Sequence, residues 1–267
     1  MNQTGLQSLL SDLPLGGVRY FATLGSTNEL AKRWADQSAP ALSLVVADEQ
    51  TAGRGRLQRR WFTPRGAALA FSLILIPRIG RGQDGILPYR YTALGALATC
   101  EALNTLLPPG NPAQIKWPND VIVSRRKLAG VLAEAGWQGE QLDTVILGIG
   151  INVAPSAVPP DEVLHYPATC VEAEAGAPVE RWELLHAVLE RLLFWNARLD
   201  KPEFLEAWND RLALRDEWVQ VTFDDGSPLE GQVLGLSEDG CLRLRDRQGK
   251  THELTGGELN VRPVGRS

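Results

Sequence analysis

The stretch Gly53-Arg54-Gly55-Arg56-Leu57-Gln58-Arg59-Arg60-Trp61 holds four arginines and two glycines, and it connects two apolar segments. The segment before it, Leu42 to Ala47, and the one after it, Ala67 to Ile76, have the composition of buried strands. Glycine lets a backbone approach a ligand closely, and arginine offers fork-shaped donors that suit phosphate or carboxylate. The sequence therefore predicts an anion-binding loop between two core strands. The alternative is a solvated basic loop or an RNA-contacting surface, and the formal net charge of −5 argues against general nucleic-acid binding.

Length and composition indicate an ordinary globular protein. The 267 residues suffice for one large domain, or for a main domain and a small one. The three cysteines are far apart and form no Cys-x-x-Cys pair, which argues against a disulfide framework or a zinc site and indicates a reducing compartment. The N-terminus has no signal-peptide pattern, and the most apolar run is too short to span a bilayer. A cytoplasmic protein without a membrane partner is expected.

The first four-fifths of the chain mixes helices, strands and hairpins. Residues 1 to 25 are predicted to be a short lead-in, and the Ser26-x-x-Glu29 spacing predicts a capping box that opens a helix. Further helices are predicted at Leu87–Leu107, Val179–Leu199 and Pro202–Leu212. Strands are predicted at Leu42–Ala47, Ala67–Ile76, Gln114–Trp117, Asp120–Val123, Leu128–Ala135 and Leu142–Ile149, and loops at Arg78–Gly85 and Ala154–Tyr166. This order favours an α+β sheet domain over alternating βαβ units.

After a boundary predicted near Arg215 the pattern changes to short strands separated by turn clusters. The five predicted strands are Val219–Phe223, Gly231–Leu236, Cys241–Arg245, Thr251–Leu254 and Leu259–Val261. Such spacing is typical of a small β-barrel.

Four segments could carry chemistry. They are the arginine loop, Lys116-Trp117-Pro118-Asn119-Asp120, Lys127-Leu128-Ala129-Gly130, and Gly148-Ile149-Gly150-Ile151-Asn152. For the last three the alternatives are a turn, a hairpin-edge lysine and a strand that ends in a bend. A functional role is considered for Lys127 because it is predicted to lie across a hairpin from Asp120. One is considered for the Gly148–Asn152 segment because its backbone could approach a ligand closely. The chain has no complete P-loop, dinucleotide fingerprint or nucleophile elbow, and its histidines show no ligand spacing.

These segments occur together with Ser26-Thr27-Asn28 and Glu49-Gln50, in the order seen in biotin protein ligases. The chain resembles the single-function bacterial class of that family over about residues 20 to 265. The resemblance implies an α+β catalytic domain (1–214), a mixed sheet with helices on one side as in class II synthetases. It implies a C-terminal SH3-like β-barrel domain (215–267). The N-terminal DNA-binding domain of repressor-type members has no counterpart here, so operator binding is not expected.

The resemblance also implies an activity. Members couple biotin to ATP with Mg²⁺, form biotinyl-5′-AMP, and pass biotin to a lysine of the biotin carboxyl carrier protein or domain of acetyl-CoA carboxylase. The residues implied to hold biotin are Ser26, Thr27, Gln50, Gly53, Arg54, Arg56 and Lys127. Those implied to hold ATP are Arg56, Arg59, Trp61, Lys116, Asn119, Asp120 and Asn152, with Asp120 also near magnesium. Catalysis is assigned to Lys127, Arg54 and Arg56.

Two other functions fit parts of the pattern. A lipoate or octanoate protein ligase or transferase would share the catalytic fold, and a non-enzymatic RNA-binding protein would use the basic loop. Gln58 stands where the family loop often has a glycine, so the mobility of the loop is expected to differ. Both a monomer and a homodimer are compatible with the sequence.

Overall fold

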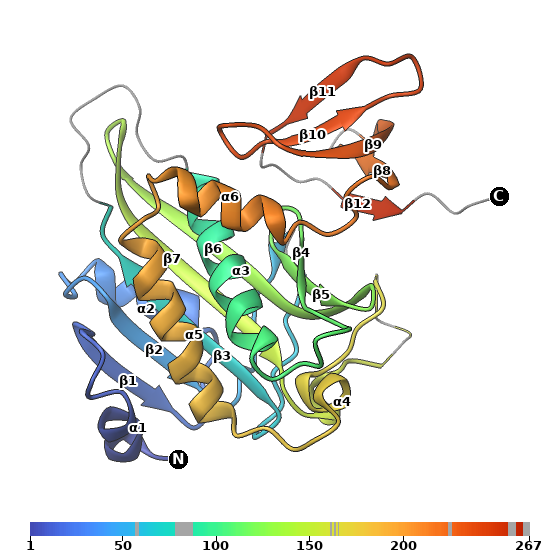
Figure 1. Cartoon of the computed structure of the whole chain (residues 1–267). Helices are drawn as coiled ribbons and strands as arrows, with labels where there is room; N and C mark the ends of the chain where they lie inside the picture. Colours follow the sequence, from blue (N-terminus) through green and yellow to red (C-terminus); the bar gives the residue numbers. More distant parts are fainter. Residues whose placement is uncertain are drawn as a thin grey trace.

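The structure, a computed structural model, describes residues 1–56, 59–77, 88–160, 162, 164, 166–223, 226–255 and 260–263. In the described part of the chain the strands form two sheets (Figure 1). The larger sheet contains β1 (Gly17–Phe21), β2 (Ser43–Ala47), β3 (Ala68–Leu75), β4 (Gln114–Lys116), β5 (Asp120–Val123), β6 (Arg126–Gln138) and β7 (Gln141–Asn152). Its spatial order is β1-β2-β3-β7-β6-β5-β4.

Strand β7 occupies the centre of this sheet. It pairs antiparallel with β3 on one side and with β6 on the other, and among the strand pairs of the described residues only β1 and β2 run parallel. Every residue of β2 and β3 is buried, as expected for apolar runs without polar alternation. The arginine loop that connects β2 to β3 is therefore anchored at both ends in the core.

Helices cover the larger sheet unequally. They are α1 (Gln3–Leu9), α2 (Thr27–Ala35), α3 (Pro88–Asn104), α4 (Val171–Ala175), α5 (Arg181–Asn196) and α6 (Pro202–Asp210), with a 3-10 turn, η2, at Pro155–Ala157. The main core lies between the sheet and the α3–α5–α6 layer, as in the expected α+β fold (Figure 1). On the other face α2 packs over β2, β3 and β7 through Ala31, Val45, Ile74 and Ile146. This leaves room on that face for a pocket.

The C-terminal sheet contains all five predicted strands. They are β8 (Trp218–Thr222), β9 (Pro228–Leu236), β10 (Leu242–Arg245), β11 (Thr251–Leu254) and β12 (Asn260–Pro263). Neighbouring strands of the described residues pair antiparallel, in the order β11-β10-β9-β8-β12. The boundary near Arg215 stays a prediction.

The turn between β9 and β10 contacts the larger domain through its backbone carbonyls. The carbonyl of Gly240 accepts from Trp117 Nε1 at 3.4 Å, and that of Asp239 accepts from the Tyr89 hydroxyl at 2.5 Å. Burial raises the pKa of the Tyr89 hydroxyl, so it stays a donor at neutral pH. Gly240 has φ +88°, and a Cβ there would lie 2.5 Å from the Trp208 ring of α6, so the close approach requires glycine.

Three expectations need correction. Residues 1 to 25 are more than a lead-in, because they form α1 and β1, which are tied together by the Gln3 side chain bonding the backbone of Val18 and Tyr20. The short helix α4 was not predicted. Ser26 is the N-cap of α2, but its side chain makes no capping bond, and the N–H of Thr27 donates instead to Gln50 Oε1 at 2.8 Å. The predicted loop at 78–85 lies outside the described residues.

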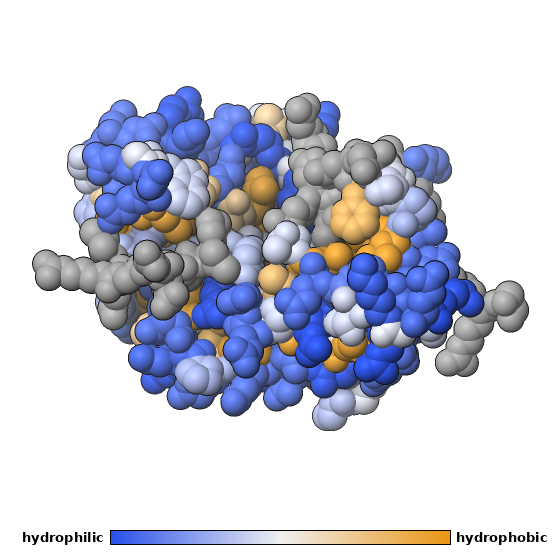
Figure 2. Space-filling view, turned by 90° about the horizontal axis from the view of Figure 1, so that it is seen from above, coloured by the Kyte–Doolittle hydropathy of each residue, from blue (hydrophilic) through white to orange (hydrophobic). Residues whose placement is uncertain are grey.

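The surface seen from above is mostly hydrophilic, with apolar side chains visible in its hollows (Figure 2). None of the helices in the described ranges combines the length and apolar character needed to cross a bilayer. All three cysteines are buried free thiols, and burial raises the pKa of Cys100 to about 12, which makes it a poor nucleophile.

Candidate active site

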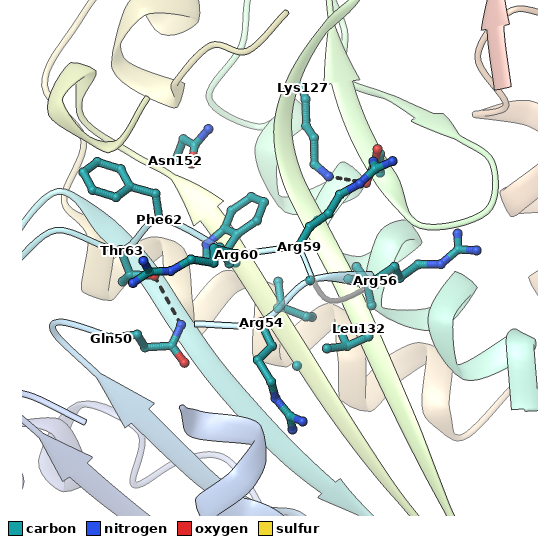
Figure 3. Close-up of a pocket in the computed structure, with 18 of the residues that line it drawn as sticks. Gln50, Arg54, Arg56, Arg59, Arg60, Phe62, Thr63, Lys127, Leu132 and Asn152 are labelled. Carbon is teal, nitrogen blue, oxygen red and sulfur yellow. Dashed lines mark hydrogen bonds and ion pairs between the residues drawn. The ribbon is translucent and has the colours of Figure 1, made fainter. Parts of the chain in front are cut away.

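A pocket of about 900 Å³ opens on the sheet face that α2 covers only in part (Figure 3). It brings together nearly all of the site residues predicted from the sequence. Those that line it are Ser26, Thr27, Gln50, Arg54, Arg56, Arg59, Trp61, Lys116, Asn119, Asp120, Lys127 and Asn152. Gly53 is the exception: a Cβ there would lie 2.5 Å from the Trp61 carbonyl, so this glycine permits two backbone segments to approach each other.

One end of the pocket is polar and uncharged. Gln50 Oε1 accepts from the N–H and the hydroxyl of Thr27 at 2.8 and 3.1 Å. Gln50 Nε2 donates to Thr63 Oγ1 at 3.2 Å (Figure 3). The hydroxyl of Ser72, on β3, lies 2.8 Å from Thr27 Oγ1. Because Ser26, Thr27 and Ser72 are buried, this end is a fixed set of neutral hydrogen-bonding groups.

The arginine loop closes on itself through its backbone. The N–H of Trp61 donates to Gly53 O at 2.9 Å, and the N–H of Gly55 donates to Arg59 O at 2.7 Å. Its side chains diverge: Arg59 extends toward Lys127, whereas Arg54 points away from it (Figure 3). Arg56 donates to Asn119 Oδ1 at 2.8 Å, which connects the loop to the β4–β5 turn. Gln58 lies outside the described residues.

Trp61 lies against the centre of the sheet. A Cβ on Gly150 would be 2.3 Å from its indole ring, and one on Gly130 would be 3.1 Å away. A Cβ on Gly148 would be 2.0 Å from Asn28 Oδ1. The bare backbone predicted at Gly148–Asn152 for a ligand is thus covered by two side chains of the protein itself. Asn152 lines the pocket, and its amide donates to Thr169 O at 3.0 Å.

Lys127 and Asp120 face each other across the β5–β6 hairpin, as predicted. Lys127 Nζ lies 2.6 Å from Asp120 Oδ1 and 5.4 Å from the centroid of the Trp61 ring (Figure 3). The hairpin turns at Ser124 and Arg125, which both have positive φ. The backbone of Lys127 is bonded on its outer side, where its N–H donates to Pro167 O at 2.7 Å and its carbonyl accepts from the N–H of Thr169 at 2.9 Å.

Sequence reasoning did not single out several residues of this region. Tyr166 lines the pocket, with the ammonium of Lys116 4.0 Å from its ring centroid, and the interaction is a cation–π contact. Asn28, which was named in a motif but given no role, also lines the pocket, and Glu134 bonds both Asn28 and Arg54. Nothing in the local sequence marks a single Tyr or Glu for such a role, because its partners are far away in the chain.

A metal site made of protein groups alone is not found. The described residues contain no cluster of three or more His, Cys, Asp or Glu side chains suited to an ion. Asp120, predicted near magnesium, pairs with Lys127 and lies at the edge of the pocket.

Residues 20–152 match the biotin/lipoate A/B protein ligase family. That range includes every site residue predicted from the sequence. The chain is 34% identical over 222 residues to the biotin–[acetyl-CoA-carboxylase] ligase of Paracoccus denitrificans, covering 79% of this chain and 89% of that protein. The chain belongs to the biotin/lipoate A/B protein ligase family. This ligase is also 35% identical over 241 residues to the bifunctional ligase/repressor BirA of Bacillus subtilis, covering 86% of this chain and 70% of that one.

Solved structures of biotin protein ligases have the same fold as this chain. The biotin protein ligase from Aquifex aeolicus in complex with biotin and ATP superposes on this ligase with a TM-score of 0.78 at 29% identity, covering 93% of this chain and 99% of that one. The relatives and neighbours described are biotin protein ligases, so the enzyme class and the α+β fold expected from the sequence are confirmed.

Proposed function

We propose that this ligase activates biotin with ATP, releases pyrophosphate, and transfers the biotinyl group to a lysine of a biotin carboxyl carrier protein or domain of acetyl-CoA carboxylase. The observation that carries the proposal is a single pocket that joins a neutral hydrogen-bonding end at Thr27 and Gln50 to a cationic end at Lys127. A ureido ring suits the first end, and a carboxylate meeting a phosphate suits the second. The names of the relatives favour biotin over lipoate as the acid.

The chemistry needs little covalent help from the protein. A carboxylate oxygen of biotin attacks the α-phosphorus of ATP, and the bond from that phosphorus to pyrophosphate breaks. Both reactants are anions, so fixed cations and correct orientation supply most of the catalysis. In the second step the neutral amine of the acceptor lysine attacks the acyl carbon, AMP leaves, and the amine gives up a proton.

The roles proposed for the site residues follow from their places. Lys127 stabilises the reacting carboxylate and α-phosphate oxygens, while Arg56 and Arg59 face the phosphates from the loop. Trp61, Lys116, Asn119 and Asn152 form the wall proposed for the nucleotide. Magnesium would be held mainly by phosphate oxygens, with Asp120 as the nearby carboxylate, and would neutralise phosphate charge.

Location and partners are proposed on the same basis. We infer a cytoplasmic enzyme, because buried free thiols and the use of ATP both fit a reducing interior. The acceptor is proposed from the names of the relatives that modify acetyl-CoA carboxylase.

A direct assay tests the reaction. The protein is mixed with magnesium-ATP and biotin, lipoate or octanoate in parallel, and pyrophosphate and the acyl-adenylate are followed, the latter by mass spectrometry. Biotin-dependent pyrophosphate together with biotinyl-AMP is expected. Activity with lipoate alone would reassign the acid-binding end, and silence with all three acids would overturn the proposal in favour of a binding protein.

Arg56→Ala is expected to release biotinyl-AMP prematurely. The side chain bonds Asn119 across the pocket, and a hydrogen bond from a charged group contributes about 1.5–3 kcal/mol, which corresponds to roughly ten- to hundredfold faster escape. The readout is biotin attached to bystander proteins, since a free mixed anhydride reacts with any lysine. Arg33→Ala is the matched control, because Arg33 is exposed on α2 and does not line the pocket. Labelling confined to the carrier in Arg56→Ala would show that this contact does not retain the adenylate.

A further inference from the structure

Glu134 on β6 holds the charged end of Arg54. Arg54 Nη2 lies 3.2 and 3.0 Å from the two oxygens of Glu134, and Arg54 Nε lies 3.8 Å from Glu29. Neither glutamate lines the described pocket, whereas Arg54 does. The guanidinium of Arg54 is therefore directed toward two carboxylates at the rim, away from Lys127 (Figure 3).

Glu134 is itself fixed by a buried network. Its Oε2 accepts from Asn28 Nδ2 at 2.7 Å, and Asn28 Oδ1 accepts from the hydroxyl of Ser72 at 2.5 Å. The same Ser72 hydroxyl, which has a single proton, also lies 2.8 Å from Thr27 Oγ1, and the hydroxyl and N–H of Thr27 donate to Gln50 Oε1. Because Asn28 is 4% exposed and Ser72 0%, the network sets where Glu134 points.

The ion pair between Arg54 and Glu134 is weak enough for a ligand to break it. The side chains are 39% and 33% exposed, so solvent screens their attraction. Measured exposed pairs contribute only about 0.2–1 kcal/mol. An anionic ligand can therefore displace Glu134 from Arg54 at a small cost in free energy. A neutral ligand lacks the charge to compete with Glu134.

We propose that Glu134 is a positioning residue that competes with the biotin carboxylate for Arg54. The inference rests on the proposed function. In the ligand-free protein Glu134 keeps Arg54 paired at the rim, and the carboxylate of the acid must exchange with Glu134 to recruit it. Glu134 thereby sets the affinity for the acid specifically through its charge, and an uncharged biotin amide lacks the charge needed to displace Glu134 from Arg54.

The test variant is Glu134→Gln. The glutamine carbonyl oxygen can still accept from Asn28, but its side chain no longer attracts Arg54 by charge. Binding of biotin and of biotinamide to the purified protein is measured by calorimetry. Biotin is expected to bind about two- to fivefold more tightly to the variant, with binding of biotinamide unchanged.

Two further variants separate this role from a structural one. In an Arg54→Ala background, Glu134→Gln is expected to leave biotin affinity unchanged, since the competing partner is gone. Glu140→Gln, which removes the same charge from the exposed β6–β7 turn, is the matched control and is expected to change neither affinity. Thermal unfolding confirms that each variant is folded.

The outcomes are distinct. Equal changes for biotin and biotinamide, unchanged or weaker biotin binding, or the same effect in the Arg54→Ala background would overturn the role of Glu134 and leave the proposed function standing. If the unmodified protein bound neither ligand, the proposed function would fail, and this inference with it.

Discussion

Lys127→Ala is expected to slow formation of biotinyl-AMP by roughly 10²–10³-fold, the loss typical when one preorganised donor to developing charge is removed. The substitution also leaves Asp120, 17% exposed, without its partner at 2.6 Å and next to the anionic reactants. The strand should persist, because the contacts of residue 127 with Pro167 and Thr169 use only backbone atoms.

Single-turnover release of pyrophosphate measures this effect, with thermal unfolding as the check on the fold. Lys250→Ala in the turn between β10 and β11, where the side chain is exposed, controls for the loss of one positive charge. Near-normal turnover in a folded Lys127→Ala protein would remove Lys127 from the catalytic assignment. A loss in stability as large as the loss in rate would make its role structural.

Gly150→Ala is expected to displace the ring of Trp61, which forms part of the pocket wall. The added Cβ would lie 2.3 Å from ring atoms of Trp61, too close for any side chain to tolerate without a shift. Overpacking of this kind costs about 1–3 kcal/mol of unfolding free energy. Because the same ring lies 5.4 Å from Lys127 Nζ, weaker binding of both substrates is expected as well.

A double substitution identifies the cause. In a Trp61→Ala background, Gly150→Ala is expected to cost almost no further stability, because the clashing ring is absent. Gly136→Ala, also within the paired strands β6 and β7, is the matched control, since its nearest neighbour would be 3.6 Å from the new Cβ. A cost at Gly150 that is the same with and without Trp61 would mean that the backbone itself, and not the ring, requires glycine there.

The sequence predicted the elements whose cause is local. Continuous apolar runs identified β2 and β3, which are buried along their whole length, and turn clusters identified all five strands of the C-terminal sheet. Strand β1 was missed because each of its residues is only half-buried and its pairing with β2 is a tertiary contact. A capping box at Ser26 was predicted and not found, because Gln50, distant in sequence, satisfies the first turn.

The site shows the same division. Its residues were predictable from motifs in order, and the Lys127–Asp120 pair from hairpin geometry. The directions in which the side chains point were not predictable. That of Arg54, for example, is set by Glu134, which lies 80 residues further along the chain. Gly148 and Gly150 were expected to let a ligand approach the backbone, but the groups that lie against them are the side chains of Asn28 and Trp61. A glycine indicates that space is needed and leaves open what fills it.

The turn that joins β9 and β10 has a consequence for truncation. Gly240 covers the ring of Trp208 and accepts from the indole of Trp117, and these tryptophans are only 1% and 4% exposed. A shortened chain ending at residue 214 would uncover two large aromatic surfaces, one of them in the strand-turn segment that forms part of the pocket wall. Such a fragment is expected to aggregate, or to be cleaved early by proteases, even though its own sheet is complete.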